Sequence, residues 1–76
     1  MKSELIKLAG KMIALGNGSR KGRSDSWSGV IKLDGKLYLV SVQWPDDAEA
    51  HEADSSIREI KSTTRPVWTA EEIDAA

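Results

Sequence analysis

Apolar and polar positions alternate most regularly in the middle of the chain, over residues 26–44. Two strand-like runs there flank Asp34-Gly35, a dipeptide typical of the two-residue turn of a β-hairpin. This turn pairs Leu33 with Lys36 and fixes the faces, because side chains alternate across a sheet. The predicted core face carries Trp27, Ile31, Leu33, Tyr38, Val40, Val42 and Trp44. The other face is mixed, which predicts partial cover; it carries Ser26, Ser28, Val30, Lys32, Leu37, Leu39, Ser41 and Gln43.

Residues 3–15 have apolar side chains at helical spacing and predict an amphipathic helix. Gly16 follows where a left-handed residue commonly ends a helix. Gly10 lies inside the helix and costs about 1 kcal/mol relative to alanine, so we expect a neighbour to pack closely there.

Residues 16–29 are rich in glycine and serine and predict a loop, mobile over 16–26. Its basic centre consists of Arg20, Lys21 and Arg23. The glycine spacing matches neither the dinucleotide fingerprint nor the phosphate loop. Both motifs also follow a strand and open a helix, whereas this loop follows a helix and leads into a strand. A nucleotide site is therefore not predicted.

The segment after Pro45 predicts an acidic helix over residues 46–61. Asp46 and Glu49 have the spacing of a capping box, and basic residues at the end suit the helix dipole. An alternative keeps only a short helix and makes Ser56–Thr64 a third strand, because its isoleucines and threonines favour strands. The sequence leaves both interpretations open.

Residues 65–68 read as extended, and Thr69 with Glu72 forms a second capping box that opens a short C-terminal helix. The predicted fold is α+β in a single domain over residues 1–76. An N-terminal amphipathic helix packs on an antiparallel β-hairpin or small sheet, and an acidic helix and a short C-terminal helix follow.

The amino-acid composition excludes several kinds of chemistry. The 76 residues contain no cysteine, which excludes disulfides, thiol catalysis and cysteine zinc sites. No apolar run approaches the roughly 18 residues of a membrane helix, and no signal peptide is evident, so we expect a cytoplasmic protein without a membrane partner.

The net charge of −1 hides a strong asymmetry: residues 1–44 carry +5 and residues 45–76 carry −6. Such asymmetry favours a charged partner. The acidic segment can compete for a basic groove on a nucleic-acid-binding protein, because it offers the same sign of charge as phosphate. Its carboxylates are Asp46, Asp47, Glu49, Glu52 and Asp54.

Candidate catalytic and metal-binding groups are few. On a helix, His51 would lie near Asp47 and Asp54, but a solvated histidine on an acidic face is the simpler interpretation. A serine–histidine pair lacks burial and an orienting acid. We therefore expect no enzyme activity, no metal and no cofactor.

The aromatic residues are Trp27, Tyr38, Trp44 and Trp68, and the simplest prediction is that they build the core. The alternative is a stacking surface for single-stranded nucleic acid next to the basic loop. That interface would use Arg20, Lys21, Arg23, Trp27, Lys32 and Tyr38. The sequence pI of about 5.7 counts against it.

Residues 27–45, W-S-G-V-I-K-L-D-G-K-L-Y-L-V-S-V-Q-W-P, resemble hairpins in small phage and mobile-element proteins of unknown function. The resemblance covers about a quarter of the chain and contains a packing motif without catalytic residues. The acidic segment after Pro45 departs from the pattern of those proteins.

These observations lead to three hypotheses about the function of the protein. The first is a non-enzymatic interaction protein: a small phage-type accessory protein or inhibitor, similar to anti-CRISPR proteins, that binds a nucleic-acid-handling protein through charged surfaces. The second is a single-stranded nucleic-acid-binding module. The third is a small homo-oligomer that associates through the mixed sheet face and an unpaired strand edge.

Overall fold

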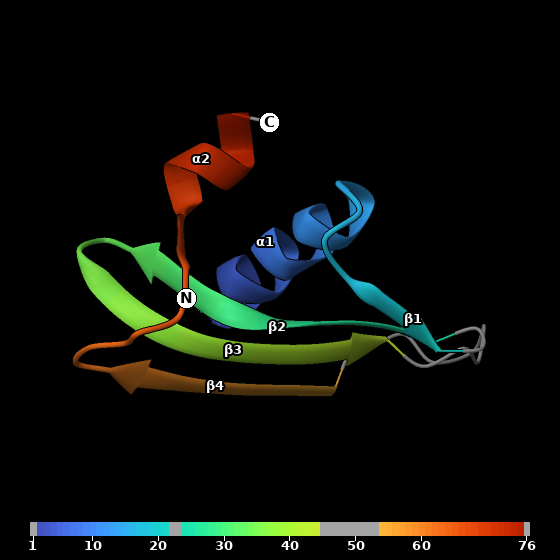
Figure 1. The fold of residues 1–76 in the computed structure, drawn as a ribbon, viewed down its shortest axis with the longest axis horizontal. Helices are drawn as coiled ribbons and strands as arrows, with labels where there is room; N and C mark the ends of the chain where they lie inside the picture. The colour runs from blue at the N-terminus through green and yellow to red at the C-terminus, as the bar shows by residue number, and fades with distance from the viewer. Residues whose placement is uncertain (1, 22–23, 45–53, 76) are drawn as a thin grey trace.

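The computed structural model describes residues 2–21, 24–44 and 54–75. The fold is α+β, with an N-terminal helix, a small sheet and a short C-terminal helix (Figure 1). The elements in chain order are α1 (Lys2–Ala14), β1 (Ser19–Lys21), β2 (Ser24–Leu33), β3 (Lys36–Trp44), β4 (Asp54–Ile60), β5 (Val67–Thr69) and α2 (Ala70–Ala75).

Helix α1 buries one stripe of side chains against the sheet, as its spacing predicts: Leu5, Leu8, Ala9 and Met12. Gly16 has a φ of 87°, and its N–H donates to the Ile13 carbonyl at 2.9 Å. The Asn17 N–H donates to the Met12 carbonyl at 2.9 Å, which completes a Schellman motif. The expected left-handed end of the helix is confirmed.

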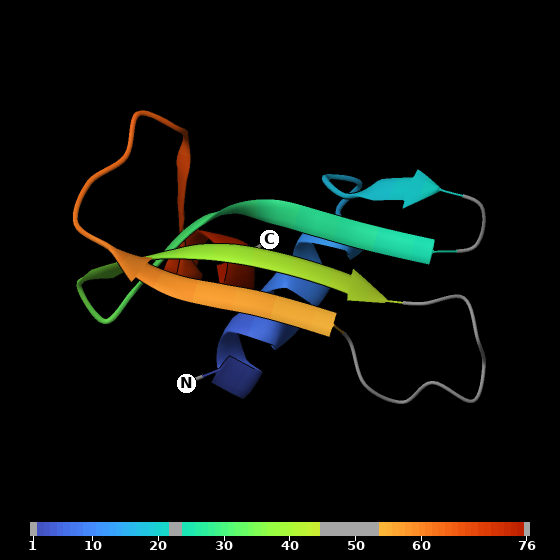
Figure 2. The ribbon, with the colours of Figure 1, turned by 90° about the horizontal axis from the view of Figure 1, so that it is seen from below.

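The sheet contains five strands, and four of them lie side by side in one row. Strands β1, β2, β3 and β4 are antiparallel neighbours in that order. Strand β5 pairs in parallel with residues 30–32 of β2. Strand β1 pairs with residues 24–26 of β2, so β1 and β5 share the same edge of β2 at different points along it. Figure 2 shows β1 to β4 side by side, with the helices behind them.

A tight turn joins β2 to β3. Asp34 and Gly35 both have positive φ, 53° and 79°, as a type I′ turn requires. Leu33 pairs with Lys36, Ile31 with Tyr38 and so on, which is the register that a two-residue turn imposes.

The helix predicted over residues 46–61 is wrong for its second half, because residues 54–60 form β4. Ile57 lies opposite Val40 of β3 and packs against the core. Pairing with β3 and this packing outweigh the local charge pattern that suggested a helix. The alternative third strand was right in type, although β4 starts two residues earlier and ends at Ile60. Residues 46–53 lie outside the described part of the chain.

The loop predicted over residues 16–29 is also wrong in part. Ser19–Lys21 forms β1, and β2 already begins at Ser24. Serine-rich sequence gives little strand signal, but the edge of β2 offers backbone groups with which β1 pairs.

Both helices cover one face of the sheet. Trp27, Ile31, Tyr38 and Val40 lie in the core beneath them, as predicted. Helix α2 begins as its capping box predicts, because the Glu72 N–H donates to Thr69 Oγ1 at 3.1 Å. No helix in the described residues has the length and apolar character to cross a membrane.

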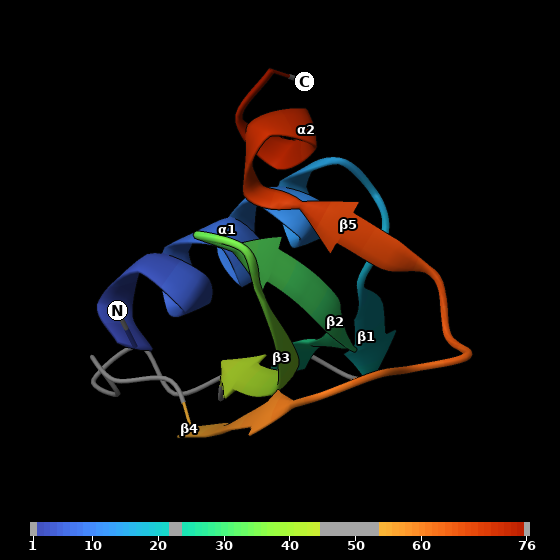
Figure 3. The same ribbon diagram turned by 90° about the vertical axis from the view of Figure 1, so that its left-hand side faces the viewer.

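The opposite face of β2, β3 and β4 carries no helix, and we call it the open face. The connection from β4 to β5, residues 61–66, runs on this side of the sheet, while α1 lies on the other (Figure 3). Val30 points to the open face and is nevertheless fully buried, between Leu39 of β3 and Val67 of β5. The predicted partial cover of this face is therefore confirmed around Val30.

Candidate binding face of the sheet

Three serines form a row across the open face. Ser28 of β2 lies opposite Ser41 of β3, and Ser41 lies opposite Ser56 of β4. All three are exposed to solvent. Directly paired residues of neighbouring strands have Cβ atoms about 5 Å apart, so the hydroxyl groups line up across three strands.

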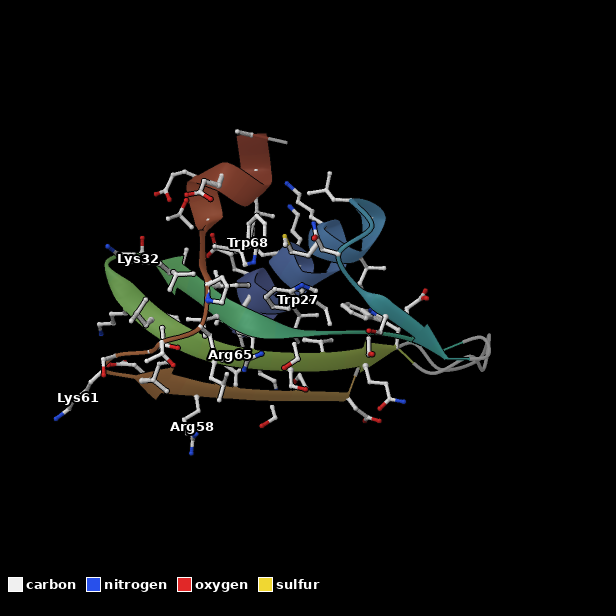
Figure 4. All side chains as sticks on the ribbon, in the orientation of Figure 1. Trp27, Lys32, Arg58, Lys61, Arg65 and Trp68 are labelled. Carbon is white, nitrogen blue, oxygen red and sulfur yellow. The ribbon has the colours of Figure 1, made fainter. Side chains whose placement is uncertain are left out.

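Two arginines join this row. Arg58 is two residues beyond Ser56 on the same face of β4, whereas Arg65 comes from the connection that crosses the open face. Figure 4 shows Arg65 in front of the β2–β3 ribbon and Arg58 at the β4 edge. A pocket of about 360 Å³ brings them together; it is lined by Ser28, Leu39, Ser41, Ser56, Arg58 and Arg65.

A local hydrogen bond shapes the connection next to Arg65. The Arg65 N–H donates to Thr63 Oγ1 at 3.0 Å, closing a turn of the type that serine and threonine side chains make with nearby backbone. The turn orders the backbone directly before Arg65, which shares a pocket with the serine row.

Lysines gather where the β2–β3 turn meets the end of β4. Lys32, Lys36 and Lys61 are exposed and line one pocket of about 380 Å³ with Glu59. Lys32 points to the same face as Arg58, whereas Lys36 lies opposite Leu33 and belongs to the helix side of β3. In the described residues, the acids nearest them in the register are Asp34 and Glu59. The open face is therefore positively charged towards the turn, although the whole chain is slightly acidic.

Apolar side chains lie between these cations. Leu37, Leu39 and Ile60 are half-buried on the open face, and Val67 of β5 is exposed there. The face thus combines cations, hydroxyl groups and an apolar floor. It can contact both a phosphate and the apolar parts of a nucleotide.

The aromatic half of the predicted nucleic-acid interface is wrong. Trp27 and Tyr38 are only 5% and 4% exposed and belong to the core. A base cannot stack on a ring that the protein already covers on both faces. The simpler prediction, that the aromatic rings build the core, holds for Trp27 and Tyr38, and the partly buried Trp44 packs against that core. It is wrong for Trp68 of β5, which is 37% exposed.

The basic residues of that interface lie in different places. Lys32 is exposed on the open face, as predicted from the hairpin register. Arg20 and Lys21 belong to β1, at the other end of β2 from Lys32. Arg23 lies outside the described residues. Of the predicted basic residues, Lys32 is therefore the one that the described structure places on the same face as the arginines.

The predicted acidic interface falls mostly on residues 46–53, which the structure does not describe. Of its members Asp46, Asp47, Glu49, Glu52 and Asp54, only Asp54 is described, exposed at the start of β4. His51 also lies outside the described residues. In residues 2–21, 24–44 and 54–75, no group of three potential metal ligands is present. The partner protein predicted for the acidic segment stays a prediction.

Sequence reasoning missed Ser56, Arg58, Lys61 and Arg65 as members of one site. The hairpin register already placed Ser28 and Ser41 on one face, which was a usable signal for two of the three serines in the row. Ser56 and Arg58 could join it only once residues 54–60 were read as a strand. Arg65 joins it through a crossing connection, which leaves no mark in the local sequence.

No protein-family model matches this chain. Neither the curated proteins nor the solved structures contain a match. Function is therefore inferred from the residues and geometry of the open face.

Proposed function

We propose that this protein acts by binding rather than by catalysis, and that its open face binds the backbone of single-stranded nucleic acid. One observation carries the proposal: Arg58 and Arg65, from separate parts of the chain, line one pocket with the serine row Ser28, Ser41 and Ser56. The predicted nucleic-acid function is thus kept, but its site moves from the basic loop to the open face.

The chemistry of the pocket suits a phosphate group. A guanidinium presents N–H donors in a planar fork that fits two phosphate oxygens at once. A serine hydroxyl can donate to a further oxygen. Arginine, lysine and serine are common partners of phosphate in nucleic-acid complexes. A carboxylate has only two oxygens and would leave part of the hydroxyl row unused.

The lysines give the phosphate backbone a path along the sheet. Ser56 and Ile60 are about 13 Å apart along β4, because a strand rises about 3.3 Å per residue. A ligand that follows β4 from the pocket towards Lys61 and Lys32 meets a cation at both ends. The path is longer than one phosphate group, which favours a polymer over a free anion.

The apolar floor favours a single strand. Leu37 and Leu39 can contact a base only if its face or edge is not stacked inside a duplex. Among the described residues no aromatic side chain lies on the open face, so we expect little sequence preference from stacking.

Fluorescence anisotropy with a dye-labelled single-stranded oligonucleotide tests the proposal at low ionic strength. The Arg65→Gln variant should bind at least about tenfold more weakly, since a hydrogen bond to a charged group contributes roughly 1.5–3 kcal/mol. Lys7→Gln is the matched control, because Lys7 is exposed on α1, on the opposite side of the sheet. It should change the affinity by less than about twofold.

Three outcomes would overturn the proposal. One is the absence of any salt-sensitive complex with the oligonucleotide. Another is an equal effect of Arg65→Gln and Lys7→Gln, which would reflect net charge alone. The third is tighter binding of poly-glutamate than of the oligonucleotide, which would assign the open face to an acidic protein segment.

A further inference from the structure

Strand β4 forms one edge of the sheet. It pairs with β3 on one side, and no other described strand pairs with its outer side. Its seven residues contain no proline. An edge of this kind presents backbone N–H and C=O groups to which another strand can add.

The charges along this edge are complementary to themselves. Asp54 and Arg58 are both exposed, point to the open face and lie four positions apart, with Ser56 halfway between them. Among the described residues, neither the Asp54 side chain nor the Arg58 side chain takes part in an ion pair or hydrogen bond. As far as the described residues are concerned, both side chains are therefore available to a strand that adds to this edge.

Two copies of β4 that pair antiparallel about a two-fold axis must place one residue opposite its own copy. With Ser56 on the axis, Asp54 of each copy lies opposite Arg58 of the other, so two attractive pairs form. With Arg58 or Glu59 on the axis, two like charges face each other. With Ile57 on the axis, Arg58 faces a serine and gains no charged partner. Charge complementarity thus selects the register centred on Ser56.

We propose that the β4 edge binds the β4 edge of a second copy of this chain, antiparallel and centred on Ser56. The two sheets then form one sheet with both open faces on the same side. The serine rows of the two copies continue into each other at Ser56. On the helix side, Ile57 of one copy lies opposite Ser55 of the other.

The described part of the interface is small. Residues 54–58 of each copy pair, which buries less than the roughly 1,200 Å² of stable complexes. We therefore expect a weak dimer in fast exchange with the monomer. Ser56 and Arg58 belong both to this edge and to the nucleic-acid pocket, but the dimer inference is argued from the β4 edge and does not rest on nucleic-acid binding.

Sedimentation equilibrium without nucleic acid, at protein concentrations from about 10 µM to about 1 mM, measures the dimer directly. Asp54→Arg and Arg58→Asp each create two like-charge pairs and should weaken the dimer at least about tenfold. The double variant Asp54→Arg/Arg58→Asp reverses both charges, restores the attraction, and should recover the wild-type constant within about threefold. Circular dichroism verifies that each variant is folded.

Lys7→Glu changes the net charge as much as Arg58→Asp does, and should leave the dimer intact. Arg65→Gln should also leave it intact, which separates this test from that of the nucleic-acid pocket. A wild-type protein that is monomeric at about 1 mM overturns the proposal. So does a double variant that fails to recover, or a dimer that none of the β4 variants weakens.

Discussion

The indole ring of Trp27 lies over Gly29, two residues further along β2 on the same face of the sheet. A Cβ atom placed on Gly29 would lie 2.7 Å from Trp27 Cζ2 and 2.8 Å from Cη2. Glycine inside a strand usually weakens it, because no side chain packs there. Here the ring of Trp27 fills the space that a side chain of residue 29 would occupy, and both residues are buried.

This packing predicts that Gly29→Ala destabilises the protein. The new methyl group displaces the ring of Trp27, which is surrounded by the core and cannot move freely. We expect a loss of about 1–3 kcal/mol in the free energy of unfolding. Urea denaturation measures this loss, and the near-ultraviolet circular dichroism of tryptophan should change with it. An unchanged unfolding midpoint would show that the ring yields without cost.

Gly10→Ala is the contrasting substitution, and we expect it to stabilise the protein by about 0.5–1 kcal/mol. Gly10 lies inside α1, where alanine has the better helix propensity. Its nearest neighbour, Trp44 Cζ2, would lie 3.7 Å from the new Cβ, an ordinary van der Waals distance. The sequence predicted a close neighbour at this position, and Trp44 is that neighbour. A destabilised Gly10→Ala variant in the same urea experiment would mean that Trp44 tolerates no added atom.

The cap of α2 gives a third prediction. Thr69 Oγ1 accepts the Glu72 N–H, and α2 has only six residues, so it has little stability of its own. Thr69→Ala should cost about 1 kcal/mol and expose Ile73, which the helix holds in the core. Thr69→Ser keeps the acceptor and should cost less than half as much. Thermal unfolding compares the two variants, and equal losses would mean that the methyl group of Thr69 matters rather than its hydroxyl.

Local signals were sufficient for α1, the β2–β3 hairpin and the cap of α2. The pairing of Leu33 with Lys36 follows from Asp34-Gly35 and from strict alternation, both of which lie within a few residues. The face on which Ile31 and Tyr38 are buried follows from the same pattern.

The features that could not be predicted from the sequence depend on pairing between segments that are far apart in the chain. Asp54 and Arg58 have the spacing of a helical ion pair, yet they belong to a strand because β3 offers an edge and Ile57 fits the core. For the same reason the sequence could not bring Arg58 and Arg65 together with Ser28. Their meeting depends on the position of β4 in the sheet and on a connection that crosses the open face.

The last prediction concerns the salt dependence of nucleic-acid binding. Each phosphate that a cation neutralises on a single strand contributes about −0.7 to the slope of log K against log salt concentration. If Arg65 contacts one phosphate, Arg65→Gln should make the slope shallower by about 0.7, and Arg58→Gln should do the same. Lys7→Gln should leave the slope unchanged, because α1 covers the other side of the sheet. Anisotropy titrations over a range of salt concentrations give these slopes. A loss of affinity in Arg65→Gln at constant slope would mean that Arg65 shapes the connection across the open face without binding phosphate.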